Sequence, residues 1–358
     1  MSQNLQRMQN AASLNGKRLR PHSKTHKSIM LAERQLSLGA NGVCCAKLGE
    51  AEVMADAGME DIRLPYPLNP INADRVLAVL DRARISFILD HPDVARGWSE
   101  AMAHASATVD VLVKVDVGFH RCGIDPDALN AAAFVADVAA LPGLRLRGIL
   151  SHAGHGYGAT SPEDAESIAR NEGRILRRLA EDVRALGVDV AEISVGATPT
   201  ARFSLTEPGV TELRPGNYIY FDRTQVGLGA AEWDDCALTV LARVVTAPAP
   251  DRIILDCGSK TLTNDLARGF TPMPGYGAVL TAVHGVQTVD DYLVIERLSE
   301  EHATVKVQER GTRLRPGDLV RVVPNHSCVV SNLVDSAWMV TGTDVLEALR
   351  VSARGRIT

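Results

Sequence analysis

The segment Arg20–Lys27 reads RPHSKTHK, and it governs how the rest of the chain is interpreted. Its eight positions hold five cationic or potentially cationic side chains, two hydroxyl residues and one proline. A short apolar and basic run, residues 16–19, precedes it, and an amphipathic segment begins near Ile29. This order indicates the end of a strand and the start of a helix. In α/β folds, ligands and catalytic residues collect at such junctions.

Lys24 is the residue of this segment that we expect to be reactive. Arg20, Lys27 and the neighbouring histidines crowd it with like charge, which disfavours its protonated form. A lysine that loses its proton readily can form a Schiff base with a carbonyl compound. From these residues alone, a basic strand end that binds phosphate or faces water is an equally good interpretation.

Outward from this segment, short apolar runs alternate with alanine- and charge-rich segments as far as Asp222. With Arg18–Arg20, the apolar runs are Gly42–Ala46, Asp61–Pro65, Ile85–Leu89, Val111–Val117, Leu146–Leu150, Ile193–Val195 and Val210–Leu213. The clearest helical segments are residues 2–14, Asp93–His104, Leu129–Ala140 and Pro162–Leu186. About eight βα units predict an α/β protein with a (β/α)8 TIM-like barrel. No G-x-G-x-x-G sequence opens a helix after the first strand, which weakens a Rossmann interpretation.

The composition changes after Asp222, where apolar runs are separated by Pro, Gly and Asp turns. These runs are Ala237–Val245, Arg252–Leu255, Tyr292–Ile295, Ala303–Val307 and Leu319–Val323. They predict a smaller β-rich C-terminal domain. We therefore expect a barrel domain at 1–230 and a β-rich domain at 231–358, with the stretch Thr343–Arg350 ambiguous.

The overall composition excludes several classes of protein. The chain has 358 residues, a formal net charge of −5 and 46% hydrophobic residues, as expected of a soluble globular protein. The mild acidity argues against a nucleic-acid partner. No apolar run reaches the ~18–20 residues of a membrane span, and the N-terminus lacks a hydrophobic signal region. Six cysteines without scaffold-like spacing indicate reduced thiols and a cytoplasmic location.

Polar residues follow the last three barrel runs, at the strand ends where reactive groups collect. The run Leu146–Leu150 is followed by SHAGHGYG, residues 151–158, whose histidines and tyrosine are spaced by glycines that permit close backbone approach to a ligand. The next two strand ends offer backbone N–H groups that suit a phosphate dianion. These phosphate candidates are Gly196, Ala197 and Thr198 in one loop and Gly216 and Asn217 in the other. Ordinary turns are the alternative.

The β-rich domain contains PNHSC, residues 324–328, in which His326 and Cys328 are two positions apart. On a strand, this spacing would put both side chains on one face. Imidazole and thiolate suit zinc, and two protein ligands suffice for an open site that water and substrate complete. A buried cysteine beside an exposed histidine is the alternative. We assign no role to Lys47, Asp256, Lys260 or Asp265.

RPHSKTHK resembles the lysine-bearing strand of pyridoxal-phosphate enzymes with the alanine-racemase-like fold, in particular the D-serine dehydratase and D-threonine aldolase branch. The resemblance implies that Lys24 holds pyridoxal phosphate as a Schiff base. Gly118, Arg121 and Gly123 resemble the segment D-x-G-x-x-R-x-G, which implies that Arg121 lies near the cofactor ring. A salt bridge from Arg121 to Asp116 is the alternative.

Further matches favour the dehydratase side of this branch. His155 and Tyr157 fall on a G-H-x-Y-G segment, which implies catalytic roles for both and cofactor contact for Tyr157, and SVGATPT matches the phosphate segment. His326-x-Cys328 resembles the zinc pair of the D-serine dehydratases, whereas the aldolases use His-x-Asp, which suits manganese. Relatives also have a strand before residues 2–14, so we expect the true start to lie upstream.

The resemblance implies dehydration of a β-hydroxy-D-amino acid, such as D-serine or 3-hydroxy-D-aspartate, to a 2-oxo acid and ammonia. The first alternative is a metal-dependent D-threonine aldolase. The second, from another class, is a non-catalytic pyridoxal-phosphate carrier, although such carriers are single barrels. The resemblance also implies a homodimer, in which the β-rich domain of one subunit faces the barrel of the next.

Overall fold

The computed structural model describes residues 1–283 and 286–358, and these form two compact units. The barrel unit comprises Leu5–Gly156, Glu163–Gly216 and Asp335–Thr358. The β unit comprises Met1–Asn4, Tyr157–Pro162 and Asn217–Val334. This division lies upstream of the predicted boundary at 230/231, and it groups the end of the chain with the barrel.

The barrel unit is built on eight parallel strands in the sheet order β1-β8-β7-β6-β5-β4-β3-β2. An isolated parallel bridge, His22 to Cys44, joins the two ends of this sheet. The strands are β1 (Arg18–Leu19), β2 (Val43–Cys44), β3 (Asp61–Pro67), β4 (Arg84–Leu89), β5 (Val109–Lys114), β6 (Leu144–Leu150), β7 (Glu192–Val195) and β8 (Glu212–Leu213). The predicted (β/α)8 fold with a β-rich second part is confirmed.

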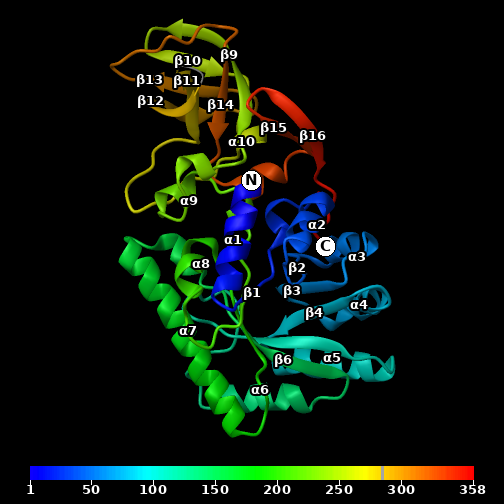
Figure 1. Ribbon diagram of the computed structural model, residues 1–358. Helices are drawn as coiled ribbons and strands as arrows, with labels where there is room; N and C mark the ends of the chain where they lie inside the picture. Colours follow the sequence, from blue (N-terminus) through cyan, green and yellow to red (C-terminus); the bar gives the residue numbers. More distant parts are fainter. Residues whose placement is uncertain (284–285) are drawn as a thin grey trace. The chain divides into compact units, whose positions relative to one another are not determined.

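The helices lie outside the parallel strands (Figure 1). They are α1 (Ser2–Leu14), α2 (Ile29–Ser37), α3 (Leu48–Asp56), α4 (Ala73–Leu80), α5 (Pro92–His104), α6 (Ala131–Ala140), α7 (Pro162–Ala185) and α8 (Thr198–Ser204). Strands such as β5 are buried at every position, so they read as continuous apolar runs. This burial on both faces explains why the sequence predicted the strands within a few residues.

The inside of the barrel contains a charged layer, here called the lower layer, formed by Arg20, Arg63, Glu192 and Glu212. Glu212 accepts hydrogen bonds from Arg63 Nη1 at 2.6 Å and from Arg20 Nε at 2.9 Å. Glu192 accepts from Arg63 Nη2 at 2.8 Å. Burial alone would raise the pKa of Glu212, but the two arginines hold it well below its usual range. Each of these buried charges therefore has an opposite charge within hydrogen-bond distance.

The β unit is a closed antiparallel barrel in the order β10-β13-β12-β11-β14-β9. Its strands are β9 (Val240–Ala249), β10 (Arg252–Leu255), β11 (Ala278–Val283), β12 (Val286–Leu298), β13 (Ala303–Val307) and β14 (Leu319–Val323), and its helices are α9 (Arg223–Gly227), α10 (Ser259–Leu262) and α11 (Ser327–Ser331). The core includes Val244, Leu255, Ile295 and Val322. Closing the sheet removes the exposed edges that an open antiparallel sheet would present.

The end of the chain forms a hairpin, β15 (Ser336–Thr341) and β16 (Asp344–Arg350), that belongs to the barrel unit. Arg34 on α2 donates to Met339 Sδ on β15 and to a carboxylate oxygen of Glu347 on β16. Because the partners of this hairpin lie about 300 positions away along the chain, local sequence pattern could not assign it to the barrel.

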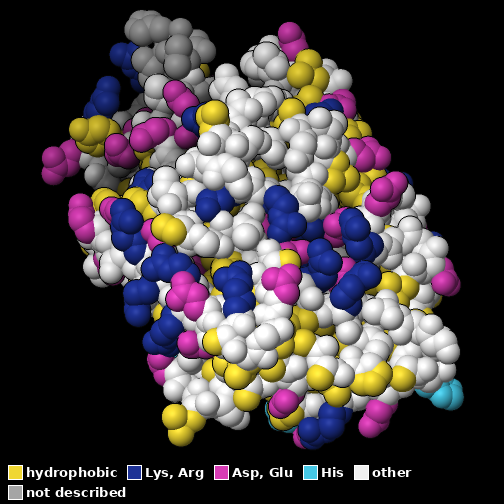
Figure 2. All heavy atoms as spheres, turned by 60° about the horizontal axis from the view of Figure 1, so that its bottom comes forward, with side chains coloured by type: hydrophobic (Ala, Val, Ile, Leu, Met, Phe, Trp, Pro, Cys, Tyr) yellow, Lys and Arg dark blue, Asp and Glu magenta, His cyan; other side chains and the backbone are white. Residues whose placement is uncertain are grey.

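Charged side chains of both signs share the surface. On the face shown in Figure 2, Lys and Arg side chains are interleaved with Asp and Glu side chains. Ion pairs also form at the starts of barrel strands, between Arg84 and Asp61 and between Arg145 and Asp110. Within the described residues, no helix has the length and apolar character needed to cross a membrane.

Candidate active site

The Lys24 turn follows β1 directly, as the sequence predicted. Residues Ser23–Thr25 form one turn of 3₁₀-helix, and the N–H of Lys24 donates to His22 Nδ1 at 3.4 Å. The Lys24 side chain is exposed, whereas its neighbours Ser23 and Thr25 are buried. The buried neighbours fix the backbone of the turn and leave the amine free to reach a ligand.

Lys27 anchors the end of this turn. Its φ of 48° lies in the left-handed region that side chains other than glycine rarely adopt. Lys27 Nζ pairs with Glu50 Oε1 at 3.0 Å, and the other oxygen of Glu50 accepts from the N–H of Ala46 at 2.7 Å. Because both partners are buried, this pair ties the Lys24 turn to helix α3. Lys27 therefore has a structural role, in contrast to the exposed Lys24.

His26 is buried and held in one tautomer. Its Nδ1 accepts from the N–H of Ser28 at 3.1 Å, so its Nε2 carries the proton and donates to Gln35 Oε1 at 3.2 Å. Burial lowers the pKa of His26 to about 4, because a charged imidazole would lose its hydration there. This side chain is a neutral structural element under ordinary conditions.

Gly216, one of the predicted phosphate-binding residues, packs against the Lys24 turn. A Cβ at this position would lie 2.9 Å from Thr25 Oγ1 and 3.1 Å from the carbonyl oxygen of His22. Only glycine permits so close an approach without displacement of the turn. The loop after β8 and the Lys24 turn are thereby brought together.

His152 links the ends of strands β6 and β7. Its Nδ1 donates to the carbonyl oxygen of Gly196 after β7. Burial lowers the pKa of His152 well below its usual range, and the positive charges of Lys24, Lys114 and Arg121 lower it further. The sequence analysis singled out His155 in this segment and missed His152, although SHAGHGYG contains both.

Arg121 lies on a loop that folds back on the end of β5. The N–H of Ile124 donates to the carbonyl of Lys114 at 2.8 Å, which closes the loop. Asp116 accepts from the N–H groups of Gly118 and His120, both at 3.0 Å, and contacts the His120 ring. The Asp116 oxygens are thus used within the loop. The guanidinium of Arg121 instead lies over the Phe119 ring, 5.1 Å from its centroid.

His155 has surroundings different from those of His152. Its ring lies against Gly118, because a Cβ added at Gly118 would lie 3.6 Å from His155 Nε2. Its Nδ1 is buried without a hydrogen-bond partner among the described residues, and burial lowers its pKa. Tyr157, the next predicted residue, belongs to the β unit.

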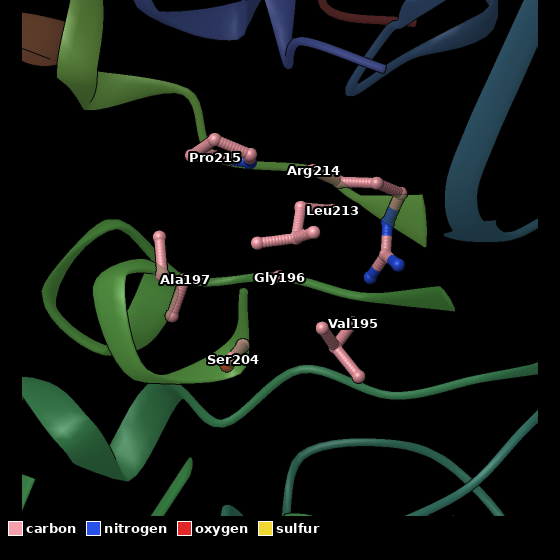
Figure 3. A pocket seen from close by; sticks show the side chains of 8 residues that line it. Val195, Gly196, Ala197, Ser204, Leu213, Arg214 and Pro215 are labelled. Atoms are coloured by element: carbon pink, nitrogen blue, oxygen red, sulfur yellow. The ribbon is translucent and has the colours of Figure 1, made fainter. Parts of the chain in front are cut away.

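Arg214 is a buried site residue that the sequence analysis missed. Its Nη1 donates to Ser194 Oγ at 2.6 Å and its Nη2 to the carbonyl of Ser151 at 2.5 Å. Its Nε is buried and has no acceptor within the described part of the chain. Leu213, one position earlier, points to the other side of β8, toward a small apolar crevice that Ala197 and Ser204 also line (Figure 3).

These residues fit an anionic, ring-shaped cofactor with a phosphate group. Arg214 Nε is an unused buried N–H donor, and Gly196 and Gly216 leave the space that a side chain would fill. Lys24, Arg121 and Arg214 surround the same region with positive charge, as their combined effect on the neighbouring histidines indicates. The region therefore offers donors and charge that the protein itself does not use.

His326 and Cys328 do not lie on a strand, so this part of the prediction is wrong. Strand β14 ends at Val323, and His326 is the residue before the short helix α11, which contains Cys328. The turn is fixed by Asp222, which accepts from the N–H of Ser327 at 2.9 Å and from Asn217 Nδ2 at 2.5 Å. The Asn217 side chain, predicted near a phosphate, thus supports the turn between His326 and Cys328.

Asp265 orients His326, a role that the sequence analysis did not assign. His326 Nδ1 contacts Asp265 Oδ2 at 3.0 Å. Partial burial lowers the pKa of His326, but its bond to Cys328 and the carboxylates of Asp222 and Asp265 raise the value to about 9. A carboxylate on the far nitrogen is the usual support of a metal-binding histidine.

The donor set around this turn is small. In residues 1–283 and 286–358, no group of three or more His, Cys, Asp or Glu side chains is placed to hold a metal ion. Nitrogen from His326 and sulfur from Cys328 fit zinc in an open site, where water or substrate completes the coordination. The remaining unassigned residues have surface contacts: Lys47 with Tyr66, Asp256 with the N–H of Arg243, and Lys260 with Glu301.

A parallel eight-stranded barrel followed by an antiparallel β barrel is the architecture of alanine racemases. An alanine racemase of Clostridium difficile shares it, with a TM-score of 0.68 over 98% of this chain at 13% identity. Residues 1–224 match the family "Alanine racemase, N-terminal domain", and residues 237–340 match "Putative serine dehydratase domain". The chain belongs to this family.

Its relatives include enzymes of two kinds. The chain is 34% identical to a D-threonine aldolase of Arthrobacter sp., covering 98% of this chain and 89% of the relative. It is 31% identical to the D-threo-3-hydroxyaspartate dehydratase of Delftia sp. (strain HT23), covering 92% and 88%. The solved structure of this dehydratase has a TM-score of 0.90 at 29% identity, covering 98% and 94%.

Two further solved structures of a D-threo-3-hydroxyaspartate dehydratase carry single substitutions. One replaces a cysteine by alanine and is in the metal-free form, and the other replaces a histidine two positions earlier by alanine. A D-threonine aldolase from Filomicrobium marinum has a TM-score of 0.86 at 29% identity, covering 100% of this chain and 94% of that one.

Proposed function

We propose that this protein is a pyridoxal-phosphate- and zinc-dependent lyase that dehydrates a β-hydroxy-D-amino acid, such as D-serine or 3-hydroxy-D-aspartate. The products are a 2-oxo acid and ammonia. The relatives act as lyases on D-threonine or D-threo-3-hydroxyaspartate, which supports this reaction class. We also propose that the protein acts as a homodimer in the cytoplasm.

The observation that carries the choice of dehydration is the sulfur of Cys328 beside His326. A histidine and a cysteine two positions apart are the residues replaced in the two D-threo-3-hydroxyaspartate dehydratase variants, one of them metal-free. The same spacing here, with Asp265 on the far nitrogen of His326, supports a zinc site in this chain.

The residues of the barrel unit provide binding and proton transfer. When bound, pyridoxal phosphate supplies an electron sink for breaking the Cα–H bond. Lys24 would hold the cofactor covalently, and its Nζ would accept the α-proton of the substrate. The N–H groups of Arg121 and Arg214 bind the ring. The backbone N–H groups of the loops at Gly196–Thr198 and Gly216–Asn217 bind the phosphate.

The pair in the β unit acts on the leaving group. A zinc ion supplies a Lewis acid for the β-hydroxyl, which leaves more readily when its charge is stabilised. His326 Nε2 and Cys328 Sγ hold this metal, while Asp265 keeps the ring of His326 oriented. His155 and Tyr157 are proposed to contact the substrate or the cofactor during proton transfer.

Aldol cleavage of D-threonine-like substrates is the second candidate function, and the 34% identity to an aldolase favours it. Cleavage of the Cα–Cβ bond needs a base on the β-hydroxyl instead of an acid. The unpartnered Nδ1 of His155 is a neutral nitrogen that suits such a base. A non-catalytic cofactor carrier, by contrast, would have no use for the His326 and Cys328 pair.

Paired product assays separate the two reactions. Pyruvate released from D-serine supports dehydration, and glycine with an aldehyde from D-threonine supports aldol cleavage. After chelation, restoring activity with zinc or with manganese identifies the metal. If turnover survives chelation intact, the metal pair is structural and the proposed mechanism is wrong.

Cys328→Asp tests the assignment of the metal pair. We expect dehydration to fall by at least ~100-fold, the upper end of what changes around a metal commonly cost. Metal preference should shift toward manganese, because a carboxylate oxygen suits harder ions than a thiolate does. Cys257→Ser, at a buried cysteine in the core of the β unit, is the control. A Cys328→Asp variant that behaves like the wild type contradicts the assignment.

A further inference from the structure

Lys27 has a strained backbone, and it lies three residues after the candidate cofactor lysine. Its φ of 48° is in the left-handed region, which costs free energy for a residue with a Cβ. Such a conformation persists where the surrounding structure fixes it, and it is found more often at functional sites than elsewhere. The contacts of Lys27 therefore identify what holds the end of the Lys24 turn in place.

Lys27 is held at its N–H, its side chain and its carbonyl. The N–H donates to the carbonyl of Ser23 at 2.7 Å, which closes the Lys24 turn. The Nζ pairs with the buried Glu50 of helix α3 at 3.0 Å. The carbonyl accepts from the N–H of Ala353, a fully buried residue, at 2.9 Å. Two of these three partners lie outside the turn.

Ala353 lies in the stretch that follows strand β16, residues 351–358, here called the clamp segment. Its neighbour Ser352 contacts the start of α2, where Ser352 Oγ accepts from the N–H of Ile29 at 3.4 Å. Ser28, the residue before α2, makes no capping bond with its own side chain. A residue 323 positions away therefore supplies the kind of bond that a local capping side chain supplies elsewhere.

The far end of the clamp segment contacts helix α3, which carries Glu50. The N–H of Gly49 donates to the carbonyl oxygen of Thr358 at 2.8 Å. A Cβ added at Gly49 would lie 3.1 Å from that oxygen and 3.3 Å from the Cβ of Arg356. The contacts thus close a ring, because Lys27 is bonded to both the clamp segment and α3, and these two are bonded to each other.

We propose that Lys27 and the clamp segment are positioning residues for Lys24, because together they fix the backbone from which the Lys24 side chain projects. That side chain is exposed, so the direction of its amine depends on the backbone of the turn. Releasing Lys27 from its strained conformation unwinds the end of the turn. A displacement of about 1 Å at a reacting atom can cost on the order of 100-fold in rate. This role rests on the proposed function, in which Lys24 binds the cofactor.

Two variants open the ring at different points. Lys27→Met with Glu50→Gln removes the ion pair without leaving a buried charge unpaired. Ser352→Ala removes the acceptor of the Ile29 N–H, and Ser352→Thr restores a hydroxyl at the same position. Ser352→Ala is the milder change, so it decides the test if the double variant does not fold.

The matched control is an ion pair at the opposite end of the barrel strands. Arg145→Met with Asp110→Asn removes a pair near the starts of β6 and β5, and its carboxylate is also buried. A substitution that acts only through stability should affect this control and the Lys27 variant alike. A positioning role should separate them.

The first measurement is the rate at which the violet band forms when pyridoxal phosphate is added to each cofactor-free protein, with borohydride reduction to locate the label. Band formation on Lys24 should be about 10- to 100-fold slower in the Lys27 and Glu50 double variant. It should be about three- to tenfold slower in Ser352→Ala, which loses one hydrogen bond. Ser352→Thr and the control should match the wild type. In both clamp variants, kcat should fall with KM nearly unchanged.

Hydrogen–deuterium exchange of the cofactor-free proteins tests the clamp without the reaction. Exchange in residues 23–29 should be faster in both clamp variants and unchanged in the control. Band formation at the wild-type rate in both clamp variants, or an equal loss in the control, would overturn the proposal. A wild type that forms no band on Lys24 would instead overturn the proposed function. The exchange rates would then still decide whether the clamp segment fixes the turn.

Discussion

Two layers of side chains inside the barrel differ in how far their charged and polar groups are paired. In the lower layer, Glu212 and Glu192 satisfy Arg20 and Arg63 through bonds of 2.6–2.9 Å. Two positions further along the same strands, Glu212 is followed by Arg214 and Glu192 by Ser194. This upper layer, with Lys114 and Glu172, contains polar atoms without partners.

The difference separates what holds the barrel together from what it can bind. A buried polar group without a partner costs free energy, so it persists where a ligand or a proton completes it. Strand residues two positions apart face the same side, which places both layers inside the barrel. The lower layer is complete without a ligand, and the upper layer is not.

The largest effect is expected from Lys24. Replacing it by alanine removes the amine that holds the cofactor, so we predict a loss of activity of at least about 10³-fold. After borohydride reduction of the wild type, peptide mapping should find the cofactor on Lys24. Lys47→Ala is the control, since Lys47 is a partly exposed lysine between the next strand, β2, and helix α3. Cofactor found on Lys47 or Lys114, with Lys24 unmodified, contradicts the assignment.

Lys24 could be proposed as the cofactor lysine from sequence because a dense local motif carries it, and that assignment stays a prediction. The barrel strands could be predicted for a similar reason, because burial on both faces makes them continuous apolar runs. Arg214 and Glu172 could not be identified, because their hydrogen-bond partners come from other strands and loops. Only Glu172 has a signal in the sequence, because it is a charged residue on the apolar face of α7 between Ala169 and Leu176.

The turn at His326 shows a different limit of sequence analysis. The spacing of His326 and Cys328 was read as a strand, but Pro324 and Asn325 end β14 and Asp222 caps the following turn from about 100 positions away. The sequence singled out the pair of residues but not their local geometry, because that geometry depends on a distant carboxylate. Asp265 was noticed without a role for the same reason.

Breaking the lower layer should affect stability more than chemistry. Glu212→Gln leaves Arg20 and Arg63 without their shared carboxylate, so we predict a loss of about 3–5 kcal/mol in the free energy of unfolding. Urea unfolding measures this loss. Activity per folded molecule should change far less than in the Lys24 variant. A Glu212→Gln protein of wild-type stability would mean that the lower layer is not a structural unit.

His26 in the Lys24 turn and Glu212 in the lower layer should also differ in how they make stability depend on pH. His26 has a pKa of about 4 when folded and about 6.5 when unfolded, so unfolding takes up a proton between these values. Stability therefore falls as the pH drops from 6.5 toward 4, by about 2 kcal/mol at pH 5 for this residue. The lowered pKa of Glu212 affects stability at lower pH. Its stabilising contribution is complete above about pH 4.5 and is lost as the pH falls below that value.

His26→Asn isolates the histidine contribution. The asparagine oxygen can accept from the N–H of Ser28 as Nδ1 does, but it does not titrate. The slope of unfolding free energy against pH between 6.5 and 4.5 should become smaller. His91→Asn is the control, because exposed His91 accepts from the N–H of Asp93 in the same way. An unchanged slope in His26→Asn would show that other groups take up the proton.

The smallest effect is expected from Phe119, which supports the upper layer from its edge. Its ring meets the ring of His152 edge-on at 5.7 Å and lies under the guanidinium of Arg121 at 5.1 Å. Contacts of these kinds contribute roughly 0.5–1.5 kcal/mol each. Phe119→Leu should therefore weaken cofactor binding by about three- to tenfold and leave the fold intact.

The chain contains a matched contact with which to test this prediction. The guanidinium of Arg202 lies 4.6 Å from the centroid of the Phe203 ring on α8, and neither residue belongs to the upper layer. Phe203→Leu should therefore lose a similar contact without weakening cofactor binding. If both variants weaken binding equally, the loss comes from general packing. If only Phe119→Leu does so, the ring positions His152 and Arg121, and the unsatisfied layer extends to the rim of the barrel.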